Sequence, residues 1–173
     1  GTVTMGGGSE PPERVRISTV TASLMPMLGL APALGRGFTP AEDTTDAPGV
    51  VILSDGLWRR RYGGDPNVLG RTLRIDNDAY QVIGVVSKDF RHPSLTLETD
   101  AEVWAPSGWK TAPFPAPRHS LRFLPGAIGR LKPGVTIDTA NNELRALTGR
   151  LGVQFKATNG DWSARAVLLA HEI

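Results

Sequence analysis

The chain contains no cysteine among its 173 residues. This absence excludes disulfide bonds, thiol catalysis and metal sites with cysteine ligands. A chain without cysteine suits an oxidising compartment, although cytosolic proteins can also lack it. The absence of cysteine therefore excludes these kinds of site but does not identify the cellular compartment.

An excess of charge of one sign is also lacking, because the chain has 19 basic and 17 acidic residues and a formal net charge of +2. A small excess near balance moves the isoelectric point to about 9.3, so this value does not indicate a nucleic-acid partner. Only the stretch SDGLWRRRYGG concentrates positive charge, with Arg59–Arg61 between Trp58 and Tyr62. Such a stretch is typical either of a phosphate-binding patch or of a short exposed helix. We expect the helix, with the arginines on its solvated face and in its later turns.

Long apolar runs and catalytic motifs are missing as well. No run approaches the ~18 apolar residues of a membrane-spanning helix. Nucleophile elbows, phosphate-binding glycine loops and zinc-binding HExxH motifs do not occur. We therefore expect no enzyme and assign no catalytic residue.

Residues that could bind a metal are scattered. The acidic segment with Glu42, Asp43 and Asp46 lacks the spacing of an EF-hand loop, and we expect it to be solvated. The histidines have no metal-binding partner at helical spacing; they are His92, His119 and His171. We expect no metal site and no cofactor-binding residue.

Glycine and proline are plentiful, at 20 and 14 residues, which indicates many turns between short elements. Residues 1–13 are small, polar and glycine-rich, and we expect them to fray. Apolar patterns and helix signals predict five strand regions and three helices. The strands are expected at 14–20, 50–53, 72–86 (a hairpin), 102–106 and 163–169, and the helices at 24–28, at 55–62 and from Thr136 to a stop at Gly152.

The order of these elements is β-α-β, then a strand-rich middle, then β-α-β, which predicts an α+β fold. The two ends of the chain can form one lobe into which the middle is inserted. We therefore expect one discontinuous lobe from residues 1–36 and 117–173, and an inserted strand-rich lobe from residues 37–116 that contains a short helix and the hairpin.

Two tryptophans, Trp104 and Trp109, flank a proline-rich stretch. They can pack within the protein or between its lobes. They can also form an exposed interaction surface, since tryptophan is enriched at binding hot spots. Both alternatives remain open at this point.

Several segments, in order, resemble the MacB-like periplasmic core domain family. Residues 54–86, SDGLWRRRYGGDPNVLGRTLRIDNDAYQVIGVV, resemble the family pattern S-x-x-x-W-x-x-x-[FY]-G-x-[DN]-P, followed by a glycine and a hairpin ending in G-V. Residues 21–43 resemble the preceding family segment, a short helix followed by G-R-x-[FL]. The sequence VWAP and residues 129–147 resemble the later segments. The joint order across residues 14–170 carries the resemblance.

The resemblance implies the large extracytoplasmic loop of an ABC-transporter permease subunit, related to the FtsX and LolC groups. Such a domain lies on the periplasmic side of the bacterial inner membrane, between two transmembrane helices, and has a porter-like lobe interrupted by a second lobe. Its implied role is mechanical: it couples cytoplasmic ATP hydrolysis to export, extraction or signalling to a partner. ATP is used by a separate cytoplasmic domain or subunit, so no cofactor is expected here.

The implied partners are the flanking transmembrane helices and the cytoplasmic ATPase. A second permease copy and a periplasmic partner protein are further candidates, and nucleic acid is not expected. The residues that match the motif receive structural roles. They are Ser54 as helix cap, Trp58 and Tyr62 as packing residues, Gly63 and Gly64 as helix stop, Pro66 as turn former, and Gly70 and Gly84 where a turn or a close backbone approach is needed.

Two other hypotheses remain beside this one. The first is a stand-alone periplasmic or secreted binding module that uses Trp104, Trp109 and the proline-rich stretch as its surface. The second is a hydrolase whose catalytic groups come together only in space, which would require a pocket with convergent polar groups.

Overall fold

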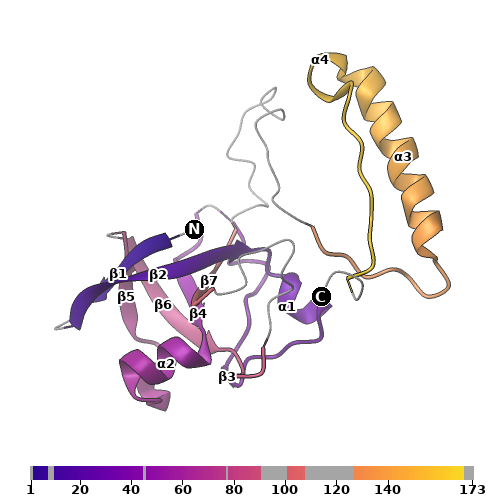
Figure 1. The fold of residues 1–173 in the computed structure, drawn as a ribbon. Helices are drawn as coiled ribbons and strands as arrows, with labels where there is room; N and C mark the ends of the chain where they lie inside the picture. The colour runs from indigo at the N-terminus through magenta and orange to yellow at the C-terminus, as the bar shows by residue number, and fades with distance from the viewer. Residues whose placement is uncertain are drawn as a thin grey trace. The chain divides into compact units, whose positions relative to one another are not determined.

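The computed structural model describes residues 2–7, 10–44, 46–76, 78–90, 101–107 and 127–169. The chain divides into two compact units, Gly1–Pro113 and Phe114–Ile173. The first unit is built on a sheet, and the described part of the second is helical (Figure 1). The mixed content of helices and strands confirms the α+β class.

The first unit contains one seven-stranded mixed sheet with the order β3-β6-β4-β7-β2-β1-β5. Because β5 also pairs with β6, the pairings run in a closed ring and β3 is attached to it at β6. The strands are β1 (Thr2–Gly7), β2 (Glu10–Val20), β3 (Leu34–Gly35), β4 (Val50–Leu53), β5 (Thr72–Ile75), β6 (Asp78–Val85) and β7 (Val103–Pro106). The helices are α1 (Leu24–Met27), α2 (Asp55–Tyr62) and the 3-10 turn η1 (Pro66–Val68).

Two long strands close this ring by changing partner along their length. Strand β2 pairs antiparallel with β1 in its first half and parallel with β7 from Ile17 to Val20. Strand β6 pairs antiparallel with β5 from Asp78 to Gln81, and then runs parallel to β4. A buried cluster from β1, β2, β4, β5, β6, β7 and α2 forms the core.

The predicted hairpin is confirmed as β5 and β6. Leu73 and Ile75 are buried while their neighbours are exposed, as the alternation in the sequence predicts. Asp76 adopts a φ of 47° in the turn, a conformation that aspartate and asparagine tolerate better than most residues. Its carboxylate accepts a hydrogen bond from the backbone N–H of Thr4 at 2.9 Å, so the turn is also held by β1.

The expected fraying of residues 1–13 is wrong for β1 and the start of β2. Met5 is fully buried, and β1 pairs with both β2 and β5. The strand was missed because its apolar content is low. Its position is decided by backbone hydrogen bonds to two neighbouring strands.

The sheet does not follow the expected lobe boundary between residues 36 and 37. Strands from both sides of that boundary pair directly, β2 with β7 and β1 with β5. All described strands up to Pro106 therefore belong to one unit. The association of residues 1–36 with 117–173 in a porter-like lobe stays a prediction.

The second unit contains α3 (Ile137–Gln154) and α4 (Lys156–Asn159). The predicted helix start is confirmed, because the Thr136 hydroxyl accepts from the Thr139 N–H at 3.1 Å. The predicted stop at Gly152 is wrong: α3 continues for two more residues, and Gly152 lies where a side chain would come within 3.3 Å of the Asn159 carbonyl. No side chain of α3 is buried.

The strand expected at 163–169 is also not formed. Residues 162–168 have no assigned strand structure. The Ala166 N–H donates to the side-chain oxygen of Asn141 on α3 at 2.7 Å, and the Ala166 carbonyl accepts from the Asn141 side-chain nitrogen at 3.1 Å. The Asn141 side chain therefore makes the hydrogen bonds to the Ala166 backbone that a neighbouring strand would make in a sheet.

Candidate functional site

The motif helix α2 begins and ends where the sequence predicts. The Ser54 hydroxyl accepts from the Leu57 N–H at 3.0 Å, which caps the first turn. Gly63 follows with a φ of 62°, and its N–H donates to the Arg59 carbonyl at 3.0 Å. Gly64 is also left-handed, with a φ of 75°. Both glycines therefore serve as the helix stop.

Three side chains attach α2 to the core. Trp58 and Tyr62 pack against it, as predicted, and the Trp58 indole N–H donates to the Asp65 carbonyl at 2.9 Å. Leu57 was not among the packing residues predicted from the sequence, but it is fully buried and is the only α2 residue in the core cluster. Its apolar character three residues after the cap was the signal that could have identified it.

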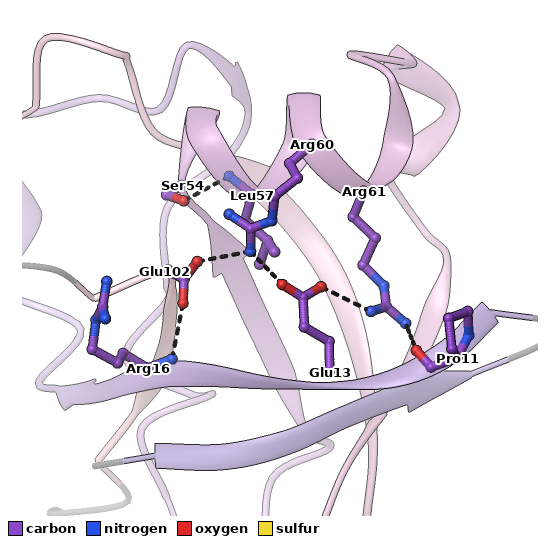
Figure 2. A network of polar contacts seen from close by, with 8 residues as sticks. All are labelled: Pro11, Glu13, Arg16, Ser54, Leu57, Arg60, Arg61 and Glu102. Atoms are coloured by element: carbon purple, nitrogen blue, oxygen red, sulfur yellow. Dashed lines mark hydrogen bonds and ion pairs between the residues drawn. The ribbon is translucent and has the colours of Figure 1, made fainter.

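The three arginines of α2 bind different sets of partners, and Figure 2 shows those of Arg60 and Arg61. Arg59 binds Asp55 one turn earlier at 2.8 Å, and 64% of its side chain is exposed. Arg60 bridges Glu13 at 2.6 Å and Glu102 at 2.8 Å. Arg61 binds Glu13 at 3.1 Å and the Pro11 carbonyl at 3.1 Å, and only 8% of its side chain is exposed. The expected solvated face is therefore wrong for Arg61.

These contacts tie three segments together at Glu13 and Glu102. Glu13 lies on β2 and Glu102 lies directly before β7, while both arginines come from α2. Partial burial opposes ionisation of Glu13, but the hydrogen bonds from Arg60 and Arg61 outweigh it and lower the pKa of its carboxyl. The hydrogen bond to Glu102, followed by that to Glu13, raises the pKa of Arg60. Both shifts favour the charged forms of Glu13 and Arg60.

Glu102 also connects these segments through its backbone. Its N–H donates to the Arg16 carbonyl and its carbonyl accepts from the Ser54 N–H, both at 2.8 Å. Its carboxylate accepts from the Arg16 N–H at 3.2 Å (Figure 2). The cap of α2 and the start of β7 are thus held against β2 by one residue.

The remaining motif residues shape the chain around the hairpin. Pro66 starts η1, and the Asp65 carboxylate accepts from the Asn67 N–H at 2.9 Å. Gly70 has a φ of 81°, which explains the glycine. A side chain at Gly84 would come within 2.6 Å of the Arg36 carbonyl, and the register with β4 shifts between Val51 and Ile52. The predicted close approach is therefore confirmed.

The acidic segment is not simply solvated. Glu42 accepts from the two terminal guanidinium nitrogens of Arg36, at 2.6 Å and 3.0 Å, and from the N–H and hydroxyl of Thr39. The hydrogen bond from Arg36 is the largest cause that lowers the pKa of Glu42, to about 2. Asp43 is buried and accepts from the Ala22 N–H and the Ser107 hydroxyl, both at 3.0 Å. Only Asp46 is exposed as expected.

Trp104 does not form an interaction surface. It lies on β7 with 3% of its surface exposed, and its ring contacts that of Phe90 edge-on at 5.4 Å between centroids. The packing alternative is therefore correct for Trp104. Trp109 and all three histidines, His92, His119 and His171, lie outside the described residues.

Within the described ranges, no group of three or more acidic or histidine side chains is arranged to hold a metal ion. No helix in this part of the chain is long and apolar enough to cross a membrane. The described residues contain a cavity of about 390 Å³ beside the first turn of α2. It is lined by polar and apolar groups.

A family model described as the MacB-like periplasmic core domain matches residues 1–147. The periplasmic region of MacB from Actinobacillus actinomycetemcomitans is similar in structure, with a TM-score of 0.59 and 18% identity over 95% of this chain and 74% of that one. A domain of a putative permease from Porphyromonas gingivalis has a TM-score of 0.57 and 23% identity, over 87% of this chain and 65% of that one.

The extracellular domain of the ABC-type transporter YknZ from Gram-positive bacteria matches over 63% of this chain and 51% of its own length, with a TM-score of 0.49 and 18% identity. The chain thus spans between half and three quarters of these solved domains. No curated protein sequence matches it. The family match covers most of the chain, including the whole helix-and-hairpin motif. The chain belongs to the family of MacB-like periplasmic core domains of ABC transporter permeases.

Proposed function

We propose that this chain is a non-catalytic domain on the periplasmic side of a bacterial permease, and that it passes on movements driven by ATP hydrolysis in the cytoplasm. The family match over residues 1–147 is the observation that carries this proposal. In this function the domain couples ATP hydrolysis to the export or extraction of a substrate, or to signalling to a partner protein. ATP is bound by a separate cytoplasmic domain or subunit, and this domain needs no cofactor of its own.

The structural roles of the motif residues support a mechanical function. Ser54, Gly63 and Gly84 shape the backbone, and Trp58 and Tyr62 pack α2 on the core. The arginines that could have bound phosphates instead bind carboxylates of the same unit. A helix held in this way moves together with the sheet, which is what the transmission of a displacement requires.

The partners we propose are the flanking transmembrane helices of the permease and its cytoplasmic ATPase. A second permease copy and a periplasmic partner protein are further candidates. The stand-alone binding module is not favoured, because Trp104, one of its two proposed contact residues, is buried.

The location is tested in whole cells that carry the full-length permease. The chain lacks cysteine, so one cysteine introduced at Val153, whose side chain is 85% exposed, reports on this segment alone. The parent permease should first be freed of cysteines elsewhere. We expect a maleimide that cannot cross the inner membrane to label it in intact cells. Labelling only after lysis would contradict the proposed side of the membrane.

The coupling is tested by spin-label distances in the reconstituted transporter. Labels at Arg59 and Val153 measure a distance between the two units. Labels at Arg59 and Arg14 measure a distance within the first unit and serve as the control. We expect ATP with vanadate to change the first distance distribution and leave the second unchanged. Identical distributions with and without nucleotide at both pairs would refute movement between the units as the coupling step.

A further inference from the structure

Helix α3 has little packing of its own. It runs over 18 residues, Ile137–Gln154, and none of its side chains is buried. An isolated helix of this length is marginal in water, since most helical stability in proteins comes from the packing of an apolar face. The helix therefore presents a face that a further element can cover.

The apolar residues of α3 form a seam with the spacing of helices that pack against one another. The seam consists of Ala140, Leu144, Leu147 and Leu151, at intervals of four, three and four residues. Leu147 is 44% exposed, and the other three are half-buried. Residues 162–168 run alongside α3 and bind it at Asn141, on one flank of the seam (Figure 1). The other flank is open.

The open flank carries one acidic and one basic residue, Glu143 and Arg150. Both are exposed, and within the described ranges neither forms an ion pair. Two helical turns, about 10 Å, separate them along α3, so they do not pair with each other. A neighbouring helix can offer each of them a charge of opposite sign.

A second copy of α3 in the antiparallel direction matches both the seam and its charges. In one register Leu144 lies opposite Leu147 of the second copy, and Ala140 lies opposite Leu151. The same register brings Glu143 beside Arg150 of the second copy, and two-fold symmetry repeats every contact. In a parallel pair equivalent residues face each other, so Glu143 would not reach Arg150. The charge pattern therefore favours the antiparallel pair.

We propose that the seam of α3 is the surface on which a second copy of this domain docks, with the two α3 helices antiparallel. Self-association is a property of the chain itself. That it joins two permease copies rests on the proposed function, which the label measurements test separately. The contact is short, so association is weak in solution. Two copies held close together in one membrane reach effective concentrations on the order of 1 mM, at which a weak contact forms.

The proposal is tested by sedimentation equilibrium of the 173-residue chain, whose mass is 18.5 kDa, at concentrations up to about 1 mM. We expect a reversible dimer that weakens as salt is added, because the flanking ion pairs are exposed. Glu143→Arg and Arg150→Glu should each weaken the dimer at least about tenfold, since each substitution places like charges together twice.

An equimolar mixture of these two charge variants provides the rescue. In the mixed dimer both flanking positions again carry opposite charges, so it should be about as tight as the parent dimer. A loss of folding in either variant would not be restored by mixing.

Two lysine substitutions connect the association to the seam. Leu147→Lys places a charge in the seam and should abolish the dimer. Val153→Lys lies two residues beyond Leu151, about 200° around the helix, and should leave the dimer unchanged.

Three results would overturn the proposal: a chain that stays monomeric at about 1 mM, a mixture of the charge variants that does not associate, or equal effects of the two lysine substitutions. If the chain stays monomeric and Leu147→Lys lowers its melting temperature, the seam packs within the chain instead. If the monomeric chain binds phospholipid vesicles and Leu147→Lys does not, a membrane covers the seam instead.

Discussion

The ion pair of Arg36 and Glu42 makes the stability of this chain depend on pH. In the folded protein the pKa of Glu42 falls from 4.5 to about 2, mainly through the hydrogen bond from Arg36. Because the charged form is favoured on folding, Glu42 contributes its full stabilisation above about pH 4.5, and this contribution is lost as the pH falls toward 2. The side chain of Glu42 is 15% exposed, whereas that of Arg36 is 52% exposed.

The size of the effect follows from this shift. One pKa unit corresponds to about 1.4 kcal/mol, so the upper bound is about 3 kcal/mol. Solvent screening at the half-exposed Arg36 reduces it, and we expect about 1–2 kcal/mol. Glu42→Gln keeps the shape of the side chain while removing its charge, so the variant should lose this amount at pH 7.

Urea unfolding of the chain and of Glu42→Gln, repeated from pH 7 down to about pH 2, measures the difference in unfolding free energy. We expect this difference to be largest at pH 7 and to shrink between about pH 4.5 and 2. Asp46→Asn is the matched control, because it removes an exposed carboxylate from the same segment and should change stability by less than about 0.5 kcal/mol. A difference that does not vary with pH would refute the role assigned to the Arg36 pair.

Three further substitutions test other contacts in the first unit. Leu57→Ala should lower the unfolding free energy by about 2–5 kcal/mol in urea, because Leu57 is fully buried; no loss would show that α2 does not depend on it. Gly84→Ala should cost about 1–3 kcal/mol, since the new methyl group meets the Arg36 carbonyl, whereas Gly129→Ala has open space; equal melting temperatures would contradict the close approach. Arg61→Gln should be more destabilising than Arg59→Gln in the same assay, because only Arg61 is shielded from solvent; the reverse order would contradict the bridging role of Glu13.

The local features of the motif could be predicted because their causes lie within a few residues. The Ser54 cap binds an N–H three residues later, and Gly63 ends the helix through its own backbone conformation. The hairpin follows from alternating apolar residues around a two-residue turn. The family resemblance rests on the same local pattern, and the family match confirms it.

The partners of charged and aromatic groups could not be predicted in this way. Arg60 and Arg61 meet Glu13 across 47 and 48 positions of sequence, and Asp43 meets Ser107 across 64. Nothing near these residues in the sequence identifies such partners. The expected solvation of Arg61 and Asp43 was wrong for this reason.

By itself, the sequence determined where α2, α3 and the hairpin begin, and which family the chain resembles, since caps, turns and alternation act over short distances. Only the tertiary structure decided that β1 belongs to the sheet, that the strands close into a ring, and that Trp104 is buried. It also decided that the first turn of α2 faces a cavity. These features depend on which strands pair, and strand pairing joins residues that are far apart in the chain.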